Sequence, residues 1–224
     1  MGLDSLTHHT DTATTTEVSP ADDPAAWVSA SATRNHVLGD PLLDWLNLYG
    51  NQHGFTRDNQ LPTYDERTDF TPFVLEQGVR FEAAVVTLLR DTHPQHELLT
   101  LTAGHDQIRD YDAAVATFEA MRSGVPIIHQ GVLWDAQHLT YGAPDLLVRS
   151  DILPFLFPDA ITAEQAATPA PDLGTPFHYL VVDIKFSTLH LDPNGELKNG
   201  GSAAAYKPQL YIYNRALGRL QGHE

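Results

Sequence analysis

The stretch Phe177-His178-Tyr179-Leu180-Val181-Val182-Asp183-Ile184-Lys185-Phe186-Ser187 decides how the rest of this 224-residue chain is interpreted. Its branched and aromatic residues predict a β-strand that is buried by core. Side chains alternate between the two faces of a strand, so Asp183 and Lys185 should point the same way. They could form a buried ion pair of purely structural value, but such a pair is costly on an interior strand. A functional role for both residues is therefore worth testing.

A second acid, Asp145, ends the run Gly142-Ala143-Pro144-Asp145. Gly142 and Pro144 indicate a bend or an edge position there. If this segment pairs with the strand around Asp183, the two carboxylates converge. Two carboxylates and a backbone carbonyl suit Mg²⁺ or Mn²⁺, which prefer oxygen ligands. A lysine close to such a metal can orient or deprotonate the attacking water.

The clearest predicted helix covers Phe73–Arg90, where apolar residues recur at helical spacing. Glu82 falls on the same stripe, three residues after Val79 and four before Val86. A carboxylate on a buried helix face is costly unless it is paired or binds a metal. The pattern alone supports equally a metal-site acid and a glutamate at the stripe's margin that reaches solvent.

Near the C-terminus a helix is predicted over Pro208–Leu220, with proline at its start. Gln209 and Tyr213 are four residues apart, so they share one face of that helix. We expect both near the helix N-terminus, where free N–H groups favour a phosphate. The alternative is that Tyr213 simply packs in the core with Gln209 at its edge.

The other elements give the predicted organisation. A short helix follows Asp40-Pro41, a strand covers Glu97–Thr102, and a helix covers Ile108–Arg122. The apolar runs Ile127–Leu133 and Leu139–Arg149 predict a β-hairpin. The predicted regions are a flexible tail (1–24), a helical arm with a loop (25–70), and a core (71–224) that contains a Pro-rich insertion (151–176).

In this order the motifs resemble the PD-(D/E)xK nuclease superfamily, most closely its RecB-like branch with CRISPR-associated and viral lambda-type exonucleases. The matching stretches are Gly78–Glu82, Gly142–Asp145, Asp183–Lys185 and Gln209–Tyr213. The third motif has Asp183 where glutamate is commoner. The resemblance implies an α/β fold of restriction-endonuclease type, with a central mixed β-sheet flanked by helices.

The resemblance also implies roles. Asp145 and Asp183 would be metal ligands together with the Ile184 carbonyl, and Glu82 would lie in the inner or outer shell. Lys185 would be the catalytic lysine. Gln209, Tyr213 and Lys207 are the expected substrate-binding residues. The implied activity is Mg²⁺- or Mn²⁺-dependent hydrolysis of DNA, with an exonuclease favoured. A structure-specific or restriction-like endonuclease and a non-catalytic DNA-binding or interaction module are the alternatives.

Composition narrows these expectations. The chain has no cysteine, which excludes disulfides and a Cys-ligated iron–sulfur cluster. No signal peptide or membrane-length apolar run is present, so we expect an intracellular protein without a membrane partner. DNA is the expected partner, and the sequence leaves open a homo-oligomer or a further C-terminal domain.

The net charge of −16 opposes nucleic-acid binding, because phosphates attract basic surfaces. The charge is uneven, however. Residues 1–182 carry 8 basic and 25 acidic residues, whereas residues 183–224 carry 5 basic and 4 acidic ones. We therefore expect weak, salt-sensitive DNA binding that is confined to a local groove.

Overall fold

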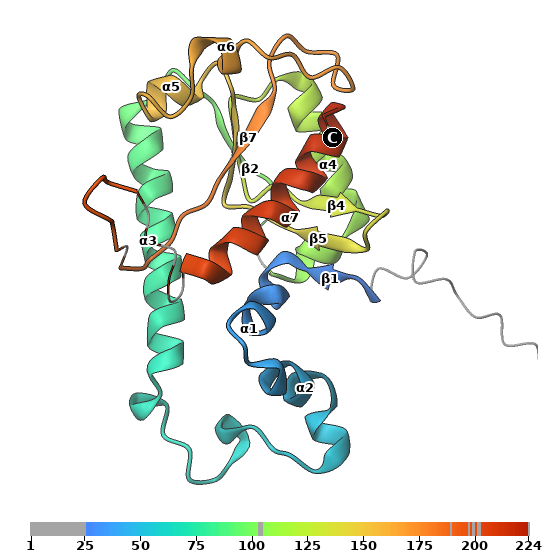
Figure 1. The fold of residues 1–224 in the computed structure, drawn as a ribbon, viewed down its shortest axis with the longest axis vertical. Coiled ribbons are helices and arrows are strands. Elements are labelled where there is room, and N and C mark those ends of the chain that lie inside the picture. Colours follow the sequence, from blue (N-terminus) through green and yellow to red (C-terminus); the bar gives the residue numbers. More distant parts are fainter. Residues whose placement is uncertain are drawn as a thin grey trace, which may run out of the picture.

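Two mixed β-sheets flanked by helices form the protein (Figure 1). The computed structural model describes residues 26–102, 105–188, 190–196, 198, 200 and 203–223. The predicted tail, residues 1–24, lies outside the described residues. The α/β class is confirmed, but the chain has two sheets where one central sheet was expected.

The larger sheet has the strand order β2 (Leu98–Thr100), β3 (Ile127–His129), β6 (Leu146–Arg149) and β7 (Tyr179–Val182). Strands β2 and β3 are parallel, whereas β3–β6 and β6–β7 are antiparallel. In the β6–β7 pair, Leu146 lies opposite Val182. The strand that follows Asp145 thus pairs with the strand that precedes Asp183, which is the condition that the sequence left open for the two acids to converge.

The smaller sheet has the order β1 (Val28–Ser29), β5 (Thr140–Gly142) and β4 (Leu133–Asp135). Strands β4 and β5 form the expected hairpin. The predicted run Ile127–Leu133 leaves the larger sheet at residues 130–132 and continues in the smaller sheet. The run Leu139–Arg149 leaves the smaller sheet at residues 143–145 and continues in the larger sheet. At the first break Gly131 passes so close to Thr117 that an added Cβ would lie 2.9 Å from that side chain. The sheet change therefore depends on contacts distant in sequence.

Seven α-helices lie in the described residues: α1 (Arg34–Val37), α2 (Pro41–Tyr49), α3 (Phe70–Thr92), α4 (Tyr111–Ser123), α5 (Leu153–Leu156), α6 (Ala163–Ala166) and α7 (Ala203–Gln221). Short 3-10 helices cover Ala30–Thr33, Gly50–His53, Asp58–Gln60, Glu66–Thr68 and His105–Arg109. The side chains of Asp40, Asp69 and Asp110 cap α2, α3 and α4 by accepting backbone N–H groups.

Only the second half of α3 is buried. Val86 and Leu89 pack against the larger sheet, whereas Leu75 and Val79 are about two-thirds exposed. Figure 1 shows the reason: the first half of α3 extends past the end of the sheets, beside the arm that carries α2. The prediction of one continuous buried stripe was wrong. Glu82 lies where the exposed half gives way to the buried half.

Helix α7 begins at Ala203, before the expected start at Pro208, which lies inside the helix. Three alanines precede Pro208, and alanine is the strongest helix former, so the helix starts a turn earlier. Gln209 and Tyr213 therefore lie in the second and third turns. The expectation that they meet free N–H groups at the helix N-terminus was wrong.

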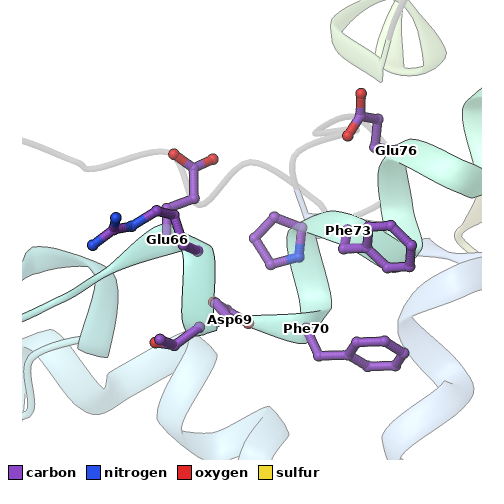
Figure 2. Close-up of a pocket in the computed structure, with 8 residues that line it drawn as sticks. Glu66, Asp69, Phe70, Phe73 and Glu76 are labelled. Atoms are coloured by element: carbon purple, nitrogen blue, oxygen red, sulfur yellow. The ribbon is translucent and has the colours of Figure 1, made fainter.

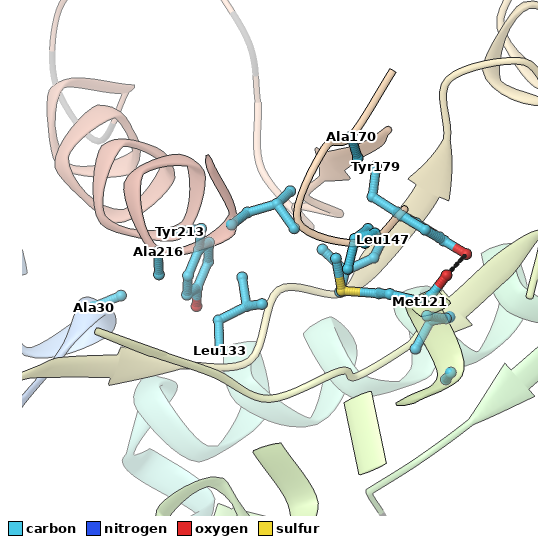
Figure 3. Packing of buried hydrophobic residues seen from close by; sticks show 12 residues of the cluster. Ala30, Met121, Leu133, Leu147, Ala170, Tyr179, Tyr213 and Ala216 are labelled. Carbon is cyan, nitrogen blue, oxygen red and sulfur yellow. Dashed lines mark hydrogen bonds between the residues drawn. The ribbon is translucent and has the colours of Figure 1, made fainter. Parts of the chain in front are cut away.

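The core lies between α7, α4 and the two sheets (Figure 3). Met121, Leu147 and Tyr179 pack at its centre, and the Tyr179 hydroxyl donates to the carbonyl groups of Met121 and Val125. A second cluster joins α3 to the other face of the larger sheet. The predicted insertion contributes to both clusters, through Ala170 and Leu153 among others. Within the insertion, α6 forms one helical turn with a capping box at Thr162.

Candidate active site

The register of β6 and β7 brings Asp145 and Asp183 together. If the pairing of Leu146 with Val182 continued by one residue, it would place the two acids opposite each other. The next position would set Pro144 against Ile184, and proline has no N–H for a ladder. The Ile184 N–H donates instead to Asp145 Oδ2, at 2.5 Å. Strand β7 accordingly ends at Val182 and not at Phe186 as predicted.

Asp183 and Lys185 point to the same side, as the strand pattern predicted. Lys185 Nζ lies 2.8 Å from Asp183 Oδ1. The Asp183 side chain is only 6% exposed, whereas that of Lys185 is 27% exposed. Lys185 Nζ also lies 5.5 Å from the centre of the Tyr206 ring, in the first turn of α7. The lysine therefore stands between the buried acid and the surface.

Glu82 enters the site from α3 and is fixed by the end of β3. Its Oε1 accepts from Gln130 Nε2 at 2.7 Å and lies 2.9 Å from His129 Nε2. Gln130 is tied to the neighbouring strand segment, because its N–H donates to the Asp145 carbonyl. Its φ of 53° is unusual for a residue with a side chain. The sequence did not reveal these two partners, because no local pattern links them to α3.

The site holds more negative than positive charge. Burial, together with the nearby charges of Asp183 and Glu82, raises the pKa of Asp145 to about 7, against the lowering effects of the Ile184 N–H and Lys185. The pKa of Glu82 is lowered, chiefly by its hydrogen bond with His129. Three carboxylates thus act on one another with a single lysine among them.

Tyr213 and Gln209 complete the site from α7. Tyr213 is buried, and Gln209 Nε2 donates to its hydroxyl at 2.9 Å. Burial raises the pKa of Tyr213 to about 12, and the charges of Asp183 and Asp145 contribute to the rise. A Cβ on Gly142 would lie 2.5 Å from Tyr213 Cε1, so the glycine of the second motif makes room for this ring. Figure 3 shows Tyr213 between Ala216 and Leu133.

The predicted residues are thus mostly brought together. The charges of Asp183, Lys185 and Glu82 act on Asp145, and those of Asp183 and Asp145 contribute to the raised pKa of Tyr213. Lys207 is different: it lies on the exposed face of α7, and no described contact joins it to the acids. Within the described residues, no three His, Asp or Glu side chains gather closely enough to hold a metal by themselves.

A cavity of about 560 Å³ lies elsewhere, at the N-terminus of α3 (Figure 2). Its lining includes Glu66, Asp69, Phe70, Phe73 and Glu76. Glu76, the lining residue nearest to Glu82 in the sequence, precedes it by six residues, roughly 9 Å along a helix, and no lining residue belongs to the acidic site. The cavity is therefore separate from the acidic site.

No protein-family model, curated protein or solved structure matches this chain. In the part of the chain that the structure describes, no helix has the length and apolar character needed to cross a membrane. The functional argument accordingly depends on the geometry of the site and on the motifs that converge there.

Proposed function

We propose that the protein is a divalent-metal-dependent nuclease that hydrolyses phosphodiester bonds in DNA, acting from strand ends. The observation that supports this most is the end of the β6–β7 pair: its last register position, Leu146 opposite Val182, adjoins Asp145 and Asp183 in the sequence, and Lys185 Nζ lies 2.8 Å from Asp183. The preference for an exonuclease comes from the motif resemblance alone.

The donor set fits Mg²⁺ or Mn²⁺. With all three acids ionised and Lys185 charged, the carboxylates outnumber the cations, even when His129 beside Glu82 is protonated, and a divalent cation would offset the remaining negative charge. Asp145, Asp183 and the Ile184 carbonyl would be the ligands, with Glu82 in the outer shell because His129 and Gln130 already hold its carboxylate. When bound, the cation would activate a water and offset charge on the phosphoryl oxygens.

The protein's own groups would position substrate and proton donors. Lys185 is held beside Asp183 and partly reaches the surface, where it would orient water or stabilise charge that develops on the phosphate. Tyr213 is protonated at neutral pH, as an ordinary tyrosine is, and its raised pKa of about 12 makes loss of that proton still less favourable. The Gln209 amide fixes the position of its hydroxyl oxygen.

The direct test is incubation of the purified protein with three DNAs: linear duplex, linear single strand and closed circle. We expect Mg²⁺- or Mn²⁺-dependent release of nucleotides from linear DNA, no nicking of the circle, and no reaction in EDTA. Nicking of the circle would assign the same site to an endonuclease. Metal-dependent cleavage of none of the three DNAs would overturn the proposal.

A further inference from the structure

Helix α7 carries positive charge in an otherwise acidic protein. Between Glu196 and Glu224 the sequence has four basic residues and no acidic one, and this is the longest acid-free run of the chain. Three of these basic residues, Lys207, Arg215 and Arg219, lie on α7. A local positive surface on a chain of net charge −16 requires a physical explanation.

One face of α7 combines this charge with an exposed aromatic ring. Lys207, Tyr211 and Arg215 are spaced by four residues, so they follow one another along the helix surface over roughly 12 Å. Tyr211 is 63% exposed, and the Arg215 guanidinium carbon lies 6.0 Å from its ring centre. We call these three residues the basic face of α7. The opposite face, with Tyr213 and Leu217, is buried.

Neutralising a buried acid explains only part of this charge. Asp135, whose side chain is 1% exposed, lies 3.6 Å from both Arg215 Nε and Arg219 Nε and 2.8 Å from His138 Nδ1. Arg215 and Arg219 approach the same carboxylate, so Asp135 by itself cannot neutralise both of them. Lys207 takes no part in this cluster, and Tyr211 contributes no charge to it.

We propose that the basic face of α7 binds single-stranded nucleic acid, with phosphates at Lys207 and Arg215 and a base stacked on Tyr211. Alternating cations and an exposed ring are the usual means of holding a single strand, because every unpaired base offers a π-face. Lys207, the first residue of the basic face, follows Tyr206, and the centre of the Tyr206 ring lies 5.5 Å from Lys185 Nζ. This inference rests on the proposed function for its substrate class, since a bound strand would enter the site at the first turn of α7.

Fluorescence anisotropy of labelled DNA in EDTA tests binding without cleavage. The probes are a mixed-sequence single strand and its duplex, each titrated with the full chain over a series of salt concentrations. For the single strand we expect Lys207→Ala to reduce the slope of log K against log salt by about 0.7, the value for one phosphate contact. Tyr211→Ala should weaken single-strand binding about tenfold, with duplex binding unchanged.

Helix α4 provides the matched control. Arg122 lies 5.9 Å from the Phe118 ring centre, which resembles the Arg215–Tyr211 pair, but it is paired with Glu119. Arg122→Ala should bind both DNAs like the wild type. The inference fails if Lys207→Ala and Tyr211→Ala bind the single strand like the wild type. It also fails if Arg122→Ala weakens binding as much, or if Tyr211→Ala weakens duplex binding equally.

Binding and cleavage separate the two proposals. If the protein cuts linear DNA but Lys207→Ala and Tyr211→Ala do not change binding, the nuclease proposal stands and the proposal for the basic face is overturned. If these two substitutions weaken single-strand binding but the protein cuts no DNA, the proposal for the basic face stands and the nuclease proposal is overturned. Arg215→Gln, checked by thermal unfolding because of its contact with Asp135, should reduce the salt slope in the same way as Lys207→Ala.

Discussion

Two buried carboxylate clusters lie against α7, and their charge balance is opposite. On the smaller sheet, Asp135 is surrounded by His138, Arg215 and Arg219. At the end of the larger sheet, Asp145, Asp183 and Glu82 act on one another, with Lys185 beside Asp183 and His129 beside Glu82. Among the described residues, the first cluster has more cations than acids, and the second has more acids than cations.

This difference separates a structural cluster from a functional one. A buried charge is tolerated when it is paired, and Asp135 is paired more than once. The acids of the larger sheet are not balanced in this way, so burial and mutual repulsion hold the pKa of Asp145 at about 7. A divalent cation would supply the missing charge. Variants in the two clusters should therefore affect different properties.

The largest expected effect is on activity, in the acid-rich cluster. Lys185→Ala and Asp183→Ala should each lower metal-dependent DNA cleavage by at least ~10²-fold, because they remove a proton-transferring group and a metal ligand. Initial rates on linear DNA measure this, with circular dichroism to confirm the fold. Lys198→Ala and Asp192→Asn, which lie between β7 and α7, are the matched controls. Wild-type rates in either site variant would refute the site assignment.

In the cation-rich cluster the expected effect is on stability. Asp135→Ala leaves two arginines beside a buried position without their carboxylate, which should lower the free energy of unfolding by about 2–3 kcal/mol; the arginines' partial exposure reduces the cost of losing a fully buried partner. Urea unfolding measures it. Asp151→Ala, which breaks a more exposed pair with Arg149, should change stability by less than ~1 kcal/mol. If Asp135→Ala and Asp151→Ala lowered the free energy of unfolding equally, the distinction between the buried pair and the more exposed pair would be wrong.

Gly142→Ala tests the ring that adjoins the acid-rich cluster. Its Cβ would meet the Tyr213 ring, so the ring must move and carry its hydrogen bond with Gln209 along. We expect a loss of about 1–2 kcal/mol in stability together with reduced cleavage. Gly78→Ala on α3, where an added Cβ meets no atom within 4 Å, is the control and should be neutral or slightly stabilising. Full cleavage by Gly142→Ala would show that the position of Tyr213 does not matter.

A further expected effect, seen as a change of stability with pH, is at Asp145. Its folded pKa of about 7 lies above the ordinary value of 3.8, so the folded state binds a proton that the unfolded state has lost. This destabilises the fold increasingly as pH rises from about 4 to about 7. Asp145→Asn removes that penalty, so its stability relative to the wild type should increase over this range and level off above it.

Glu82 contributes with the opposite sign. Its pKa is lowered, so its stabilisation is present above its unfolded pKa and is lost as pH falls through its folded pKa. Denaturant titrations at several pH values, with Asp91→Asn as an exposed control, separate the two residues. A stability difference between Asp145→Asn and the wild type that does not vary between pH 4 and 7 would contradict the raised pKa.

Much of the site could be predicted from local pattern. Alternation set Asp183 and Lys185 on one side, and their ion pair agrees with it, because this prediction depends on the geometry of a single element. Helical spacing put Glu82 on a buried stripe of α3, but only the part of that stripe after Glu82 is buried. The pairing of β6 with β7 was conditional in the sequence, and the register confirmed it.

The errors came from contacts distant in sequence. The run Ile127–Leu133 looks like one strand, but at Gln130 and Gly131 the chain leaves one sheet for the other, where α4 lies close. His129 and Gln130 reach Glu82 across 47 and 48 residues, which no spacing rule encodes. Strand β7 ends early because Pro144 and Asp145 on the partner strand alter its pairing.

The most direct test of the central claim is a crystal structure of the full chain soaked in Mn²⁺, with anomalous diffraction to identify the ion. The account predicts an ion between Asp145 and Asp183, at about 2.1 Å from a carboxylate oxygen of each. It also predicts that Lys185 Nζ moves away from Asp183. No ion at saturating Mn²⁺, with Asp183 still bound to Lys185 and Asp145 still bound to the Ile184 N–H, would contradict the account.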